Sequence, residues 1–365
     1  MHLLLAQILL AQNAGAQLAQ QLDAKDQPKI SCSITAVPPR LGFSMMHWAG
    51  FALMIPIKQF SGAGADLGIA AEVTPDGGKP VYLGERIQVP PETGEQRYPK
   101  DAQVQYMGGY FLGPGRYRVR TIAFSSGGRC RKDWSVHIRA GSEPLTLEPN
   151  QITPVGGQRW KGLATTEPRR RVTIIIEAAP LFPRRNMVRV SSYDRGVLLT
   201  ALTTILDKTG FTDATVVAAD SRNRKIVFSA ADFNPRELRR LGRAVGDINL
   251  GVVSMKTLQS GGPEKFFESV LASVDDAVRR SDAVVFLGPA WSWPGKLTPR
   301  MREIASAYPA SHYVALSRFV AVEDNLPARF VKAGNGSSRQ VFTAADLAKA
   351  IERISQAKPR DQAQR

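Results

Sequence analysis

Two patterns of apolar and polar positions divide the chain. Up to about residue 140, short runs of alternating apolar and polar residues are separated by Gly and Pro. In residues 116–120, for example, Tyr117 and Val119 would share one side of a strand while the arginines share the other. Beyond residue 170, the apolar positions recur with helical spacing between short, continuously apolar runs. The two halves therefore predict two different fold classes.

Residues 30–140 are predicted to form an all-β domain. Residues 41–57 are the most apolar stretch of the chain, but Gly50 and Pro56 interrupt it, which favours one or two buried strands over a membrane span. A tight turn at residues 127–128 leads into a strand over residues 130–138, in which Trp134, Val136 and Ile138 share one face. Short strands with Gly-rich turns are typical of an immunoglobulin-like β-sandwich, a fold that usually serves as a spacer or a binding module.

Residues 171–357 are predicted to form a doubly wound α/β domain with one antiparallel strand. Residues 172–176 form an apolar run of the kind buried on both faces of a parallel sheet. Further strands are expected at residues 215–218, 225–228, 251–255, 283–287, 312–316 and 341–342. Helices are expected at residues 194–209, capped by Asp194, from Asn234-Pro235, from Pro263, from Thr298-Pro299, and at 343–354, capped by Thr343. Residues 141–170, rich in Pro and Gly, are predicted to be a linker, and residues 358–365 a polar, disordered tail.

Composition supports a folded, basic protein. The 365 residues are enough for two domains, and 43% hydrophobic with 22% charged residues excludes wholesale disorder. Forty-eight Lys and Arg against 32 Asp and Glu give a net charge of +16. Two Cys and four scattered His exclude a zinc ribbon, an iron–sulfur cluster or a disulfide-stapled miniprotein.

The N-terminus predicts export to the periplasm or the extracellular space. Residues 1–16 combine a short apolar core with small residues before a cleavage point between Ala16 and Gln17, as signal peptidase requires. Because no Lys or Arg precedes the apolar core, an upstream start or an uncleaved amphipathic helix remain alternatives. Residues 17–29 would then be an N-terminal linker. An oxidising compartment would let Cys32 and Cys130 form a disulfide, the alternative being two buried free thiols.

The order of elements after residue 171, with a close hairpin after the first helix and a closing Gly…Val-Phe-Thr-Ala-Ala-Asp-Leu…Ala-Ile pattern over residues 334–354, resembles the von Willebrand factor A domain. The whole chain also looks like a group of exported bacterial proteins that join a β-sandwich to such a domain. The resemblance implies a metal-ion-dependent adhesion site at the carboxyl ends of the strands, built from hydroxyl and carboxylate oxygens.

This chain departs from the ligand pattern of that metal site. After the first strand it has Glu177 followed by Ala178-Ala179-Pro180, which offers one carboxylate and no hydroxyl. Residues 287–291 hold no Asp where the pattern has one, and Ser260 alone could stand for the distant Thr. We therefore expect the fold without the metal.

The loops at the carboxyl ends of two strands are candidate partner-binding surfaces. The loop after residue 177 carries Phe182, Arg184 and Arg185, and the loop after residue 287 carries Trp291 and Trp293. Trp and Arg dominate the energetics of many interfaces, and ligands of doubly wound sheets bind at this edge. The alternative is that the Trp residues pack against the N-terminal domain.

A second candidate surface is basic. Arg236, Arg239, Arg240 and Arg243 have the spacing of one helical stripe, which suits an acidic envelope polymer. The alternative is a solvated face of a basic protein. Nucleic acid is not expected, because no aromatic residues interleave with the stripe and no nucleic-acid-binding module is evident.

Catalytic motifs are missing from the sequence. It contains no Gly-x-Ser-x-Gly, His-Glu-x-x-His or phosphate-binding Gly-x-x-x-x-Gly-Lys pattern. We therefore expect a non-enzymatic, cofactor-free protein that binds a protein partner, with polymer binding as the alternative and an unrecognised hydrolase as a third possibility.

Overall fold

The computed structural model describes residues 17–24, 28–60, 64–93, 97–141, 144–155, 160–164, 169–181, 187–251, 261–317 and 325–357. The chain combines antiparallel sheets with one mostly parallel sheet, as the sequence pattern predicts. It divides into two compact units, Met1–Arg159 and Trp160–Arg365, so the division falls inside the predicted linker.

The N-terminal unit contains two four-stranded antiparallel sheets. One sheet has the order β1 (Ser33–Leu41), β2 (His47–Pro56), β5 (Gln103–Leu112) and β8 (Ile152–Pro154), and a 3-10 helix, η1 (Ile57–Phe60), follows β2. The other has the order β4 (Val81–Val89), β3 (Ala65–Pro75), β6 (Gly115–Ser125) and β7 (Gly128–Ile138). Buried side chains of both sheets, such as Phe51 and Leu67, share one core. The all-β prediction for this half is therefore confirmed.

Glycines allow β2 and β5 to pair closely. A Cβ atom added at Gly50 would lie 2.2 Å from the carbonyl oxygen of Gly108, and one at Gly109 would lie 2.4 Å from the indole nitrogen of Trp48. Because Trp48 occupies that space, a larger residue at Gly109 would displace it. The Gly108-Gly109 pair of β5 is thus a packing requirement.

The two cysteines are bonded to each other. The Cys32–Cys130 disulfide, with Cα atoms 6.2 Å apart, ties the segment before β1 to strand β7. This confirms the predicted pairing over the alternative of free thiols.

The segment assigned to an N-terminal linker is partly helical. Residues 17–23 form a short helix whose Leu22 is buried against Ala70 and Ile122. Arg120 bridges the helix to the sheet by donating to Asp23 at 2.7 Å and to the buried Glu72. Residues 1–16, which include Ala16 and the predicted signal peptide, lie outside the described residues.

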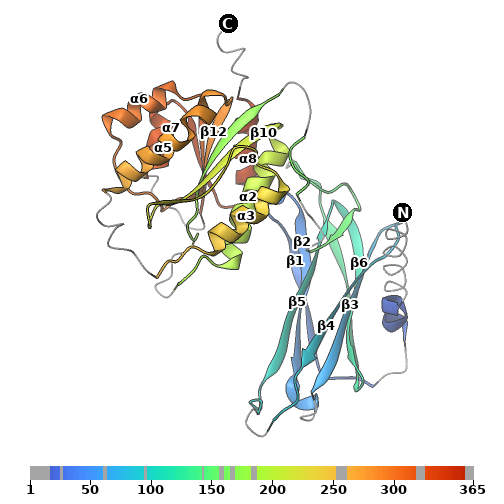
Figure 1. Ribbon diagram of the computed structural model, residues 1–365. Coiled ribbons are helices and arrows are strands. Elements are labelled where there is room, and N and C mark those ends of the chain that lie inside the picture. Colours follow the sequence, from blue (N-terminus) through green and yellow to red (C-terminus); the bar gives the residue numbers. More distant parts are fainter. Residues whose placement is uncertain are drawn as a thin grey trace, which may run out of the picture. The chain divides into compact units, whose positions relative to one another are not determined.

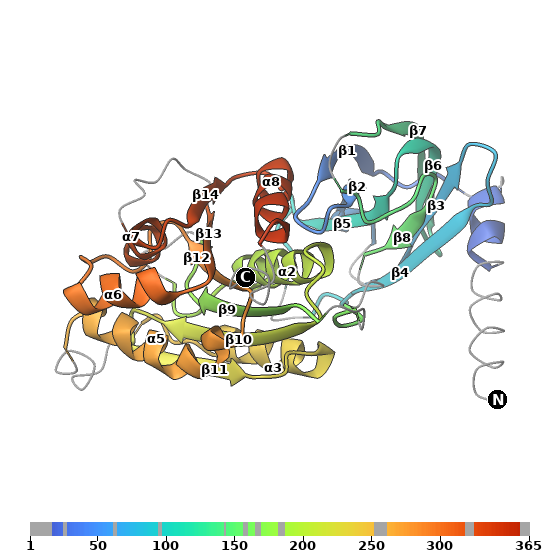
Figure 2. The ribbon, with the colours of Figure 1, turned by 90° about the horizontal axis from the view of Figure 1, so that it is seen from above.

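The C-terminal unit contains a six-stranded sheet of order β11-β10-β9-β12-β13-β14, parallel except for β11. Its strands are β9 (Arg171–Glu177), β10 (Asp213–Asp220), β11 (Lys225–Ala230), β12 (Ala283–Pro289), β13 (Ala310–Leu316) and β14 (Ser337–Val341). Its helices are α2 (Ser192–Lys208), α3 (Pro235–Gly246), α5 (Pro263–Arg279), α6 (Pro299–Ala307), α7 (Leu326–Ala333) and α8 (Ala344–Ser355). Helices cover both faces of the sheet (Figures 1 and 2), with α5, α6 and α7 sharing one apolar core.

Most of the predicted elements of this unit are present, with three differences. Helix α2 is capped by Ser191, whose hydroxyl accepts from the backbone N–H of Asp194, so the prediction of Asp194 as the cap is wrong. The last strand covers Ser337–Val341 rather than residues 341–342. Helix α7 was not predicted, although Asn325 caps it and Pro327 lies in its first turn. The predicted strand at residues 251–255 lies outside the described residues except for Gly251.

Candidate functional site

The strand order reverses its direction at β9. The chain passes from β9 to β10 on one side and later returns to β12 on the other side of β9. Ligands of doubly wound sheets bind beyond the carboxyl ends of the strands at such a switch point. Glu177 is the last residue of β9 and therefore lies at this position.

A cavity of about 420 Å³ opens at this edge of the sheet. Its wall is largely apolar, with a few polar and charged groups. The lining residues used below lie at or after the ends of β9, β10 and β12, or in the segments around residues 187 and 250: Glu177, Pro180, Met187, Asp220, Ser221, Arg222, Arg224, Leu250, Trp291 and Trp293. A volume of this size lies within the range of small-molecule sites in proteins.

Glu177 is the buried polar group of the cavity. Its side chain is 4% exposed, and its Oε1 accepts from the Ser221 hydroxyl at 2.6 Å and from the Ser221 backbone N–H at 3.4 Å. Its Oε2 has no hydrogen-bond partner among the described residues. Burial raises the pKa of Glu177 to about 8, the Ser221 hydrogen bonds oppose this shift, and the neighbouring Asp220 carboxylate adds to it. The carboxyl group is therefore mostly neutral at pH 7.

A glycine on the adjacent strand makes room for Glu177. A Cβ atom added at Gly288 of β12 would lie 2.6 Å from the Cβ atom of Glu177. Close approach of β9 and β12 at this point thus depends on the missing side chain, and it holds the Glu177 carboxyl in place between the two strands.

Trp293 is a core residue that also lines the cavity. It is 1% exposed and packs edge-on against Phe267, with ring centroids 4.7 Å apart. Its backbone has a φ of 57°, which is rare for an aromatic residue and is sustained here by the packing and by the Leu326 N–H bond to its carbonyl at 2.9 Å. Its indole N–H has no acceptor among the described residues.

Trp291 joins the two loops at the mouth of the site. Its side chain is 46% exposed, and its indole N–H donates to the carbonyl of Pro180 at 3.0 Å. The loop after β12 is further held by Asn325, whose amide donates to the carbonyl of Ala290 and to the hydroxyl of Tyr313, both at 2.8 Å. Of the two predicted tryptophans, Trp291 is therefore on the surface and Trp293 is not. Phe182, Arg184 and Arg185 lie outside the described residues.

The predicted arginine stripe is present on α3. Arg236, Arg239, Arg240 and Arg243 are all exposed. Arg240 donates to both carboxylate oxygens of Glu237, at 2.9 and 2.7 Å, so part of the charge is neutralised on the helix itself. An exposed pair of this kind contributes little stability.

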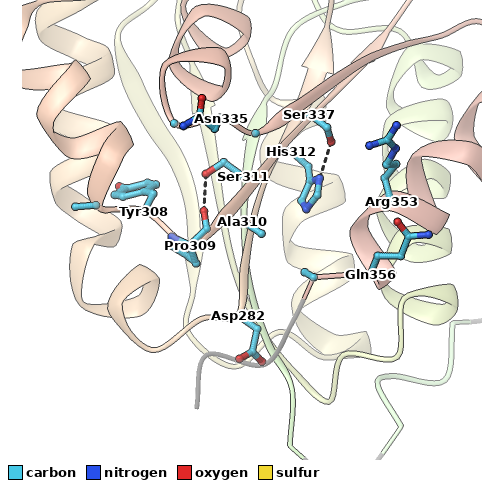
Figure 3. A pocket seen from close by; sticks show the side chains of 14 residues that line it. Asp282, Tyr308, Pro309, Ala310, Ser311, His312, Asn335, Ser337, Arg353 and Gln356 are labelled. Carbon is cyan, nitrogen blue, oxygen red and sulfur yellow. Dashed lines mark hydrogen bonds between the residues drawn. The ribbon is translucent and has the colours of Figure 1, made fainter. Parts of the chain in front are cut away.

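A second cavity, of about 630 Å³, lies at the amino ends of β12, β13 and β14 (Figure 3). His312, 8% exposed, shares a hydrogen bond of 2.7 Å between its Nδ1 and the Ser337 hydroxyl. Burial, with a smaller effect of Arg353, lowers the pKa of His312 to about 4. A histidine that is neutral and so weakly basic is poorly suited to act as a general base near pH 7.

Some features of the carboxyl-edge site had no signal in the sequence. Ser221 follows a strand in an ordinary turn, and Asn325 precedes an unpredicted helix, so the sequence predicted a role for neither residue.

Among the described residues, no group of three or more His, Cys, Asp and Glu side chains is placed to hold a metal ion. No helix of the described part of the chain is long and apolar enough to cross a membrane.

Comparisons with known proteins add little. No protein-family model matches the chain, and no curated protein matches it. Among solved structures, it is similar to a glycosyl hydrolase family 2 member from Bacteroides cellulosilyticus (11% identity, TM-score 0.20, 83% of this chain and 37% of that chain). It is also similar to β-glucuronidases from Bacteroides uniformis (7%, 0.20, 82% and 38%) and Parabacteroides merdae (8%, 0.20, 78% and 33%). The chain thus spans less than half of each of these proteins, and similarity at this level indicates neither a fold nor an activity for it.

Proposed function

We propose that this chain is an exported, non-enzymatic binding protein that holds a protein partner at the carboxyl edge of its C-terminal unit. In this proposal the C-terminal unit is a von Willebrand factor A-like domain without a bound metal, and the N-terminal unit is an immunoglobulin-like spacer. The disulfide and the strand order are consistent with the location and with the fold.

One observation carries the proposal: an exposed tryptophan stands beside a cavity at the switch point of the sheet. Trp291 is 46% exposed, yet its indole is fixed by the hydrogen bond to Pro180. A rigid, exposed aromatic side chain loses little conformational entropy on binding, which is why such residues are frequent at binding hot spots.

The test is a comparison of Trp291→Ala with Met107→Ala. Met107 is an apolar side chain of β5 that is 66% exposed. Its removal therefore controls for the loss of non-specific apolar contacts at the surface. Each full-length protein is immobilised and exposed to an envelope extract, and retained proteins are identified after a high-salt wash. We expect a discrete protein that wild type and Met107→Ala retain and Trp291→Ala loses. Equal retention by all three would refute the proposal.

A second candidate function is binding of an acidic envelope polymer through the stripe on α3. It is supported by the exposure of all four arginines on one helix. Charge-driven binding falls steeply between low and moderate salt, whereas an apolar hot spot is nearly insensitive to salt. Binding of an acidic polymer that Arg239→Gln with Arg243→Gln weakens, and that moderate salt removes, would favour this candidate over the first.

A further inference from the structure

Two residues that line the carboxyl-edge cavity carry buried hydrogen-bond donors without acceptors among the described residues. The indole nitrogen of Trp293 can only donate, and it has no partner among the described residues. Both donors of Ser221 bond to Oε1 of Glu177, so the proton of the neutral acid belongs on Oε2. That oxygen also has no partner among the described residues. Unpaired buried donors are costly, and a bound acceptor would remove the cost.

The charges that line the cavity favour an anionic acceptor. Arg222 and Arg224 come from the turn between β10 and β11. Asp220 is the one other charged residue among the described lining residues, and its oxygens already accept from the backbone N–H and the amide of Asn223, at 3.0 and 2.6 Å. With two arginines and one aspartate, the described lining carries a net positive charge in addition to the two donors.

The remaining wall is apolar. Pro180, Leu250 and Trp291 contribute side chains, together with further prolines and Met187. A ligand that fills about 420 Å³ needs an apolar body as well as acceptor oxygens, and a single Asp or Glu side chain is too small for this. The complement of the cavity is a small molecule with a carboxylate at one end.

We propose that the carboxyl-edge cavity binds a small organic carboxylate with an apolar body. Glu177, in its neutral form, and Trp293 donate to the carboxylate oxygens, the arginines complement its charge, and the apolar wall contacts its body. This inference goes beyond the proposed function, because the ligand is a free acid and no partner protein is needed.

The first experiment compares acids with amines of the same length. The full-length chain is titrated with butanoate, hexanoate and octanoate, and with the matching alkylammonium ions, by calorimetry at pH 6.5. We expect saturable binding of the acids that tightens about fourfold per methylene group, as burial of apolar surface predicts. We expect no saturable binding of the ammonium ions at the same concentrations.

The second experiment asks which form of Glu177 takes part. In Glu177→Gln the amide oxygen can replace Oε1 as the acceptor for Ser221, and the amide nitrogen can replace the protonated Oε2 as the donor. We expect this variant to bind octanoate within about threefold of wild type and to keep that affinity at pH 9, where wild type weakens. Glu177→Leu, which has no donor, should bind about tenfold more weakly or worse. His312→Gln, in the cavity at the opposite edge, should bind like wild type.

Three outcomes would overturn the inference. Binding of alkylammonium ions that Glu177→Gln abolishes would show that Glu177 acts as a carboxylate for a cation. Loss of octanoate binding in His312→Gln would place the site at the other edge of the sheet. The absence of saturable binding by every acid would show that the cavity is not a site for this class. None of these outcomes bears on the retention of a protein partner, which depends on Trp291.

Discussion

Each edge of the C-terminal sheet holds a buried side chain with a shifted pKa, and the two pKa values are shifted in opposite directions. Burial raises the pKa of Glu177 to about 8 at the carboxyl edge and lowers the pKa of His312 to about 4 at the amino edge. The cause is the same, since burial disfavours the charged form, which is the deprotonated acid in one case and the protonated imidazole in the other. Both groups are therefore neutral at pH 7.

What distinguishes the edges is the set of groups left unpaired. At the amino edge, the Nε2 of His312 lacks a partner among the described residues, but whether it donates or accepts depends on the tautomer. At the carboxyl edge, Trp293 and the neutral Glu177 are both donors and line one apolar cavity. A buried neutral group that could either donate or accept does not indicate which ligand binds. Two groups that both donate hydrogen bonds indicate a ligand with acceptor atoms.

The largest expected loss in the free energy of unfolding distinguishes the two tryptophans of the carboxyl edge. Trp293→Ala should lower the free energy of unfolding by about 3–5 kcal/mol, because it leaves a cavity beside Phe267 in the core. Trp291→Ala should lower it by less than about 1 kcal/mol, because that side chain is half exposed. Urea unfolding of both variants measures the difference. Similar losses would mean that Trp291 is also structural, and the retention experiment would then need Trp291→Phe.

The next effect tests the raised pKa of Glu177. Between its ordinary pKa of 4.5 and its folded value of about 8, the folded chain holds a proton that the unfolded chain releases, so stability falls as pH rises through this window. Glu177→Gln keeps the neutral form at every pH. We expect it to match wild type near pH 5 and to be more stable at pH 9, on the order of 4 kcal/mol, because wild type loses about 1.4 kcal/mol per pH unit up to the folded pKa of about 8. Equal pH dependence of the two proteins would refute the shift.

A smaller pH dependence of stability, with the opposite sign, is expected from His312 at the amino edge. Between its folded pKa of about 4 and its ordinary value of 6.5, the unfolded chain binds the proton of His312 that the folded chain excludes. Stability should therefore be lost as pH falls from 6.5 towards 4, and His312→Gln should flatten this part of the profile, on the order of 3 kcal/mol. Thermal unfolding across pH 4–7 measures it. A slope that the substitution leaves unchanged would show that other groups control stability there.

The sequence predicted the broad architecture well because the relevant signals are local. Pro and cap residues at Pro235, Pro263, Thr298 and Thr343 marked helix starts correctly, since capping depends on residues within one turn. Elements without strong local signals were not predicted from the sequence. Strand β5 has a Gly pair that only the proximity of Trp48 explains, and α7 is short with a proline in its first turn.

The candidate site was predicted only in its location. Residues 177–181 and 287–291 were expected at the carboxyl edge, and they are there, because parallel strands end at the same edge. Which tryptophan is buried, and which residue bonds to Glu177, could not be predicted. Neighbouring positions of one loop can differ completely in burial, and Ser221 comes from a different strand end.

The sequence by itself determined the two fold classes, the basic charge and the cysteine pair, because periodicity, composition and residue identity are written along the chain. Tertiary structure alone decided that Glu177 is buried and neutral, that Trp293 is a core residue and that Trp291 remains exposed. Burial and hydrogen bonding depend on which distant segments meet, and in this protein the meeting of β9, β10 and the loop after β12 sets the chemistry of the carboxyl-edge cavity.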